Sequence, residues 1–156
     1  MNIYLDIETD WSRNITVVGF RSEQTGLVQL VGSDASRARL LSALPRSGRL
    51  FTYNGHSFDL TVIRKCLDVD LRDHFESIDL RWVCQRNGIT GGQKKIEVQL
   101  GISRETEGVD GLEAIRLWDR YRRGDGEALT TLLRYNEEDI DGMVAIHRHL
   151  AGLKML

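Results

Sequence analysis

The sequence has 156 residues and is 41% hydrophobic, enough for one buried core, so we expect residues 1–156 to form a single domain. One proline, 15 glycines and 28% charged residues exclude collagen-like, low-complexity and disordered chains. The net charge of −2 does not indicate a polyanionic partner, and Cys66 and Cys84 lack the spacing of a disulfide framework or a zinc site. No apolar run approaches the roughly 20 residues of a membrane helix, and no signal peptide is recognisable, so we expect a cytoplasmic protein without a membrane contact.

Strands are expected early in the chain. Residues 2–8, 15–21 and 26–31 are β-branched or aromatic runs separated by turn formers, and a helix over 35–44, capped by Ser33 and Asp34, precedes Pro45. A strand over 49–53, a helix from Ser57 and a short strand around 76–78 follow. Helices are expected over 79–86, 94–100, 112–122, 127–134 and 136–150. This order predicts an α+β or α/β layer architecture.

One segment is strongly basic although the whole chain is nearly neutral. Between residues 81 and 104, five basic side chains accompany the single acid Glu97, a local charge of about +4. Arginine outnumbers lysine 17 to four in the chain, and its planar guanidinium suits phosphate recognition. A solvated helical surface and a nucleic-acid contact are both open interpretations. The basic residues are Arg81, Arg86, Lys94, Lys95 and Arg104.

The first expected strand ends in Asp6-Ile7-Glu8. Side chains alternate along a strand, so both carboxylates share one face while Ile7 points into the core. Two like charges side by side are unfavourable unless a cation or a proton joins them, which favours half of a site for a hard divalent cation. A polar strand end is the alternative, and the same spacing recurs at Asp125 and Glu127, where we expect a helix start.

A second candidate acid, Asp59, follows the Asn54-Gly55 turn in the first turn of a helix. Such an acid often only complements the helix dipole, a contribution of about 0.3–1 kcal/mol. However, a helix that starts at the carboxyl end of a strand beside the first strand would direct Asp59 into the crevice that Asp6 and Glu8 face, where open α/β sheets bind ligands.

Tyr135 and Asp139 are four residues apart in the last expected helix and so share one face. The same spacing occurs at Tyr121 and Asp125, but Gly124 interrupts that copy at an expected helix end. We therefore prefer the later pair as a candidate site.

The three segments Asp-x-Glu, Asn-x-x-x-Phe-Asp and Tyr-x-x-x-Asp occur in the order found in ribonuclease-H-like 3′-to-5′ exonucleases of the DEDDy type, and the chain resembles that family. Asn54, Phe58 and Asp59 look like the second motif of proofreading domains in family-B DNA polymerases. The helical half resembles small predicted bacterial exonucleases of the same fold. Arg134 stands where the related histidine class has its histidine, which favours the tyrosine class.

The resemblance implies an α/β fold with a central five-stranded mixed sheet flanked by helices, and two divalent ions, Mg²⁺ or Mn²⁺. It implies that Asp6 bridges both ions, that Glu8 and Asp139 complete the site of the ion that activates water, and that Asp59 holds the second ion directly or through water. Carboxylates are suitable ligands for such ions, which act on both ends of a phosphodiester displacement. Tyr135, with an ordinary pKa near 10, would be neutral and orient the attacking water.

The implied substrates are the 3′ ends of single-stranded DNA or RNA, and we expect Asn54, Phe58 and Trp11 to bind them, although Trp11 lies where related first motifs often continue with Thr-Gly-Leu. Phe58 and Trp11 could stack on terminal bases, and core packing is the alternative for each. No polymerase or helicase module accompanies the motifs, so processivity would need a protein partner. Two other functions stay open, a structure-selective endonuclease on the same fold and a non-catalytic nucleic-acid-binding module. A degenerate module usually lacks one of the acids, whereas this chain has them all.

Overall fold

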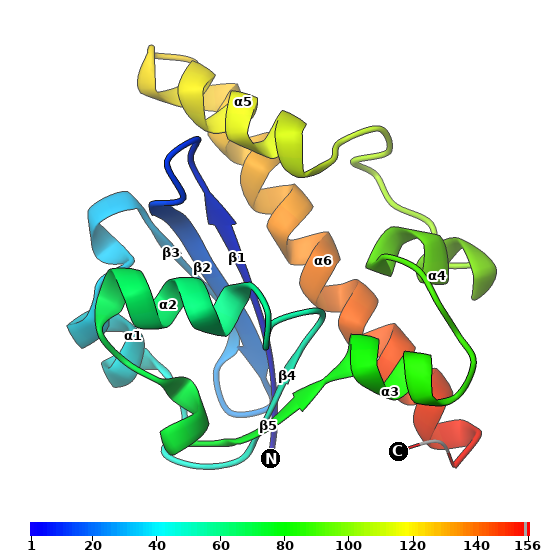
Figure 1. Cartoon of the computed structure of the whole chain (residues 1–156). Helices are drawn as coiled ribbons and strands as arrows, with labels where there is room; N and C mark the ends of the chain where they lie inside the picture. Colours follow the sequence, from blue (N-terminus) through cyan, green and yellow to red (C-terminus); the bar gives the residue numbers. More distant parts are fainter. Residues whose placement is uncertain (155) are drawn as a thin grey trace.

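The computed structural model of the chain describes residues 1–154 and 156. Its centre is a five-stranded mixed sheet with the order β3-β2-β1-β4-β5 (Figure 1). This sheet confirms the architecture expected from the sequence. The strands are β1 (Asn2–Thr9), β2 (Ile15–Ser22), β3 (Gly26–Val31), β4 (Arg49–Thr52) and β5 (Glu76–Asp79).

The first three strands form an antiparallel meander. β4 then pairs with β1 and β5 pairs with β4, both in parallel. The pairing of β1 with β4 runs only from Asn2 opposite Arg49 to Tyr4 opposite Phe51. Because β4 is short, the carboxyl half of β1 is paired with β2 on one side and has no strand partner among the described residues on the other.

Helices cover both faces of the sheet (Figure 1). On one face, α1 and α2 pack on the odd-numbered side chains of β1, such as Leu5, in a first core. On the other face, α3, α4, α5 and α6 pack on Tyr4, Val17 and Phe51 in two further clusters. The helices are α1 (Arg37–Ala43), α2 (Asp59–Leu67), α3 (Leu80–Arg86), α4 (Gln93–Gln99), α5 (Gly111–Arg122) and α6 (Gly126–Gly152).

Two details differ from the sequence prediction. The two last expected helices are one continuous helix, α6, because the Asn136 side chain bonds across to β1 instead of competing for the backbone of its own helix. The first helix begins after Ser36, whose hydroxyl accepts from the N–H of Arg39, whereas residues 32–34 form a separate 3₁₀ turn. None of the helices in the described part of the chain has the length and apolar character needed to cross a bilayer.

Candidate metal centre

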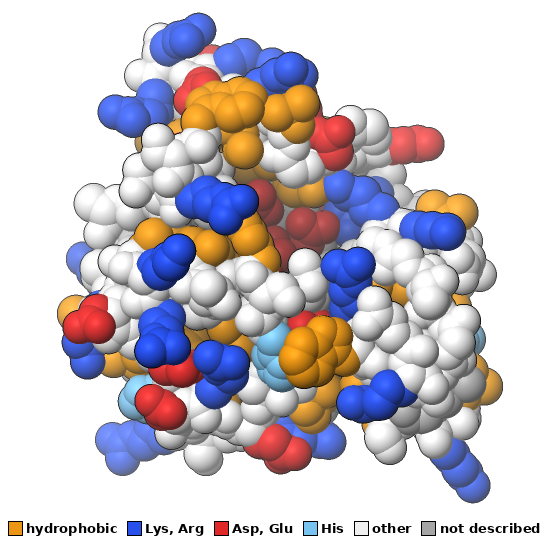
Figure 2. Space-filling model, in the orientation of Figure 1, with side chains coloured by type: hydrophobic (Ala, Val, Ile, Leu, Met, Phe, Trp, Pro, Cys, Tyr) orange, Lys and Arg blue, Asp and Glu red, His pale blue; other side chains and the backbone are white. Residues whose placement is uncertain are grey.

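A cavity of about 340 Å³ opens at the carboxyl end of β1 and is lined by residues of β1, α2, α5 and α6. Figure 2 shows acidic side chains recessed in a hollow of this face, with Lys and Arg side chains around it. The residues predicted from the sequence that line this cavity are Asp6, Glu8, Asn54, Phe58, Asp59, Tyr135 and Asp139.

Three of the acids form the tightest group. Asp6 and Glu8 project from β1 and Asp139 from α6, and one carboxylate oxygen of each lies within 4.8 Å of those of the other two. The period of two along β1 gives this arrangement, since Ile7 between them is buried in the opposite core. Sequence positions 133 residues apart thus meet in one carboxylate cluster.

Asp59 reaches the same cavity from the start of α2. Its Oδ2 accepts a hydrogen bond of 3.0 Å from the backbone N–H of Ile7. That N–H is available because β4 ends before it, so the side chain takes the place of the missing strand. Burial raises the pKa of Asp59 to about 7, against the hydrogen bond from Ile7 and with a smaller contribution from the charge of Asp139.

The other three carboxyl groups are also perturbed. Burial raises the pKa of Asp6 and Glu8 well above the ordinary range, and the charge of Asp139 raises both further. Burial raises the pKa of Asp139 as well, although the charges of Arg104 and Lys94 oppose this shift. The positive charges of Arg104 and Lys94 therefore only partly compensate the buried carboxyl groups.

A hard divalent cation fits this donor set. Oε1 of Glu8 is buried and has no hydrogen-bond partner among the described residues, a costly situation that a cation would relieve. The donors are carboxylate oxygens only, which suit Mg²⁺, Mn²⁺ or Ca²⁺ rather than softer metals.

Tyr135 lies beside the acids on α6 and is 4% exposed. The Lys94 ammonium lies 2.6 Å from its hydroxyl oxygen and 4.6 Å from the centre of its ring. Burial raises the pKa of Tyr135 and the nearby carboxylates raise it further, so the hydroxyl is protonated at neutral pH. The contact with Lys94 was not predicted, although the basic segment was a signal that this lysine contributes to a site.

Asp6 is fixed by a hydrogen-bonded chain that the sequence did not reveal. The Asn136 amide donates to Oδ2 of Asp6 at 3.0 Å, and the Gln29 amide donates to Oδ1 of Asn136, also at 3.0 Å. Asn136 is fully buried against Gly19, where a Cβ would overlap its side chain. The signal in the sequence that could have identified Asn136 as part of the site was its position directly after the candidate residue Tyr135.

Arg104 was also missed as part of the site. It belongs to the connection between α4 and α5, and its Nη1 lies 2.6 Å from Oδ1 of Asp139. Only 9% of its side chain is exposed, and the same guanidinium is also paired with Glu97. The basic segment therefore contains one buried arginine that contacts the acidic cluster.

Asp79 caps the start of α3 and also holds the turn that carries Asn54. Its carboxylate accepts from the N–H of Arg81 at 3.0 Å, of Asn54 at 2.8 Å and of His56 at 3.1 Å. Asn54 has a φ of +63°, a conformation that asparagine tolerates better than most residues. These bonds fix the rim of the cavity on the α2 side.

Two exposed tryptophans lie outside the cavity. Trp11, predicted to bind substrate, does not line the cavity; it is 57% exposed, and its indole N–H donates to Asp119 at 2.6 Å. The helical spacing of apolar residues predicts that Trp82 packs in the interior, but it is 45% exposed and meets the His56 ring edge-on at 4.7 Å between ring centres. The prediction for Trp82 was wrong because helical spacing alone cannot tell which apolar face is covered. Trp118, by contrast, is buried.

A second hollow adjoins the cavity and is basic. It measures about 300 Å³, shares Tyr53, Tyr135 and Asp139 with the first, and is bordered by Lys94 and Lys95. The acidic cluster thus continues into a region whose charge suits an anionic ligand.

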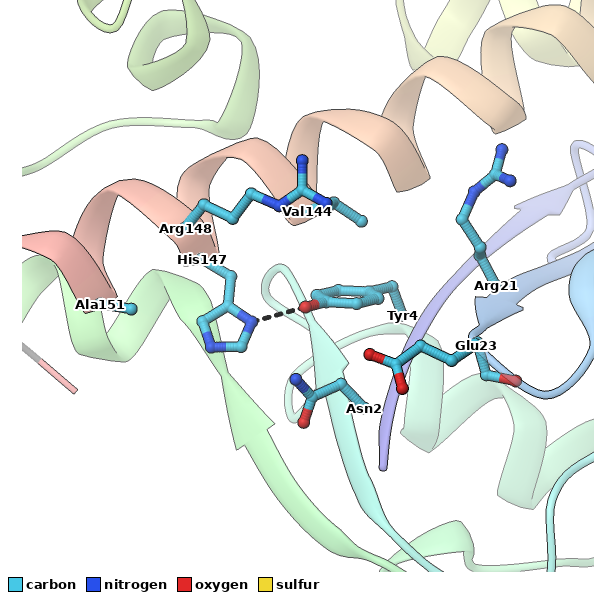
Figure 3. A pocket seen from close by; sticks show the side chains of 9 residues that line it. Asn2, Tyr4, Arg21, Glu23, Val144, His147, Arg148 and Ala151 are labelled. Atoms are coloured by element: carbon cyan, nitrogen blue, oxygen red, sulfur yellow. Dashed lines mark hydrogen bonds between the residues drawn. The ribbon is translucent and has the colours of Figure 1, made fainter.

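A third hollow, of about 360 Å³, lies at the opposite end of β1 (Figure 3). There the Tyr4 hydroxyl is hydrogen-bonded to Nδ1 of His147 at 2.6 Å, and the His147 ring stacks on Phe51. Burial lowers the pKa of His147, and Glu23 is the single acid that lines this hollow within the described chain. It therefore has no group of carboxylates for a cation.

The fold is similar to that of the family B DNA polymerase from the hyperthermophilic archaeon Pyrobaculum calidifontis. The TM-score is 0.74 at 14% sequence identity, and the match covers 99% of this chain but 25% of the polymerase chain. No curated protein sequence matches this chain significantly. The RNase H superfamily matches residues 3–151, nearly the full length, and the chain therefore belongs to the RNase H superfamily.

Proposed function

We propose that this chain is a 3′-to-5′ exonuclease of the DEDDy type, a single domain that hydrolyses phosphodiester bonds at the 3′ ends of single-stranded DNA or RNA. The superfamily consists typically of nucleases, which supports a nucleic-acid substrate. The observation that carries the proposal is the meeting of four buried carboxylates with a protonated tyrosine in one cavity.

The cofactors would be two divalent ions, Mg²⁺ or Mn²⁺, which supply charge neutralisation at the attacking and leaving oxygens of an in-line displacement. Asp6, Glu8 and Asp139 would hold one of them, since their oxygens form one group. Asp59 lies outside that group and lines the same cavity, which suits it to the second ion with Asp6 shared between both.

Tyr135 would act by hydrogen bonding. Lys94 donates to the hydroxyl oxygen, so the O–H proton of the tyrosine is left to point toward a group in the cavity. A water molecule or a non-bridging phosphate oxygen beside the acids would accept this bond. Proton removal by a tyrosinate is disfavoured, because burial raises the pKa of this group.

The substrate strand would enter along the basic hollow beside Lys94 and Lys95, with its terminal nucleotide against Asn54 and Phe58. Lysines bind the phosphates of a nucleic acid whatever its base sequence, and the Phe58 ring offers a face on which a terminal base could stack. A separate protein partner would supply processivity.

The test is a short single strand labelled at its 5′ end and incubated with Mn²⁺. We expect a ladder of products that shortens from the 3′ end, and no cleavage by Asp139→Asn. The matched control is Asp141→Asn, which removes a carboxylate two residues away on α6 that is exposed and paired with Arg21. This control should retain the wild-type rate.

A covalently closed single-stranded circle distinguishes the alternatives. Cleavage of the circle would support a structure-selective endonuclease and refute the proposed exonuclease. Binding of the linear strand without any cleavage, in the presence of bound Mn²⁺, would support the non-catalytic module.

A further inference from the structure

Arg104 makes an unusual set of contacts for a side chain beside a cation site. Its Nε and Nη2 meet the two carboxylate oxygens of Glu97 at 2.7 and 2.5 Å. Its Nη1 lies 2.6 Å from Oδ1 of Asp139, a close ion pair. One guanidinium thus joins a buried acid of α4 to a member of the carboxylate cluster on α6.

Burial and a hydrogen bond from Gln93 hold the Glu97 carboxylate in place. It is 1% exposed, and the Gln93 amide donates both to Oε2 of Glu97 at 2.9 Å and to the backbone oxygen of Asp139 at 2.7 Å. The carboxylate lies over Gly142, where any larger residue would overlap it. A bidentate pair held in this way fixes the plane and the reach of Arg104.

The two oxygens of Asp139 are therefore not equivalent. Oδ1 is engaged by Arg104, whereas Oδ2 has no hydrogen-bond or ion-pair partner among the described residues. Pairing with the Arg104 guanidinium makes Oδ1 the poorer ligand, so we expect a cation in the cluster to meet Asp139 through Oδ2.

We infer that Arg104, anchored by Glu97, restricts Asp139 to a single ligating oxygen and so makes the centre selective for six-coordinate Mg²⁺ or Mn²⁺ over Ca²⁺. This inference rests on the proposed function, since it assumes that the cluster binds divalent ions. Ca²⁺ takes six to eight oxygens and often uses both oxygens of a carboxylate, whereas Mg²⁺ requires about six in octahedral geometry. Arg104 is a positioning residue in this account and has no direct contact with an ion.

The experiment measures the dissociation constants of Mn²⁺ and Ca²⁺ for the full chain by titration calorimetry, without substrate. The main variant is Glu97→Gln/Arg104→Met, which removes both charges together, because Arg104→Met alone would leave Glu97 buried without its partner. We expect Ca²⁺ to bind about tenfold more tightly relative to Mn²⁺ than in the wild type, because both oxygens of Asp139 become available. The matched control is Arg134→Met/Glu137→Gln, which removes an ion pair from the surface of α6 and should keep the wild-type ratio.

Arg104→Lys is the second variant, and it tests geometry at constant charge. A lysine ammonium cannot bind Glu97 in a bidentate pair and contact Asp139 at the same time. The affinity of this variant for Ca²⁺ relative to Mn²⁺ should therefore rise as well. If the wild type binds Mn²⁺ and neither variant changes the ratio of the two constants, the role of Arg104 is refuted and the proposed nuclease stands. If the wild type binds no divalent ion, the proposed function fails and this inference fails with it.

Discussion

Replacement of Asp59 by asparagine should make the metal-free protein more stable at neutral and alkaline pH. Asparagine keeps the acceptor oxygen for the Ile7 N–H and removes the buried titratable group. The pKa of Asp59 is raised from 3.8 to about 7, so the folded chain holds a proton that the unfolded chain has released. The stability due to this proton is fully present below pH 3.8 and is lost as the pH rises to about 7.

The magnitude follows from the same two values. At 1.36 kcal/mol per pKa unit, the shift from 3.8 to about 7 corresponds to at most about 4 kcal/mol. The free energy of unfolding of Asp59→Asn should therefore exceed that of the wild type by an amount that grows by about 1.4 kcal/mol per pH unit between pH 4 and 7 and then levels off. Mn²⁺ should reduce this difference, because a bound cation compensates the ionised carboxylate.

The assay is urea denaturation with a chelator present, followed by circular dichroism at several pH values between 4 and 8. Asp73→Asn is the matched control, since this aspartate is exposed and lies outside the cavity. Its unfolding free energy should run parallel to that of the wild type. Parallel curves for Asp59→Asn as well would refute the reasoning, because they would mean that Asp59 is not protonated in the folded metal-free chain.

Gly19→Ala should destabilise the protein by about 1–3 kcal/mol in urea denaturation, because the new Cβ would overlap the buried Asn136 amide. Gly126→Ala, in open space at the start of α6, is the control, and an equal loss there would contradict the steric explanation. Tyr135→Phe keeps the ring and removes the hydroxyl that Lys94 contacts, so single-turnover cleavage should slow by about tenfold to a hundredfold at unchanged Mn²⁺ affinity. A matching fall in affinity, measured by calorimetry, would show that the hydroxyl supports the ligands instead.

The sequence predicted those parts of the structure that depend on local periodicity. The alternation in Asp6-Ile7-Glu8 placed two carboxylates on one face, and the spacing of Tyr135 and Asp139 placed both on one side of a helix. The β-branched and aromatic runs predicted the first three strands, and the strands over 49–53 and around 76–78 were also expected and are present. The order of the motifs supplied the five-stranded mixed sheet through resemblance to a known family, and the strand order came from the structure.

The remaining features depend on which tertiary partner meets a residue. Nothing local distinguishes Arg104, which is buried between two acids, from the exposed Arg86 of the same basic segment. Asn136 looked like the start of a new helix because its amide partner, Asp6, is 130 residues away. Trp82 has the spacing of a packed residue and yet lies on the uncovered side of α3.

The length of β4 determines whether this end of the molecule is open or closed. β4 ends at Thr52, so on the side away from β2 no strand of the described chain reaches the main chain of β1 at Ile7, and Asp59 binds there instead. Two or three extra residues in β4 would extend the parallel ladder, occupy that N–H and displace the aspartate toward solvent. The acidic pocket therefore depends on the early end of β4. A longer β4 would fill the crevice with continuous parallel sheet.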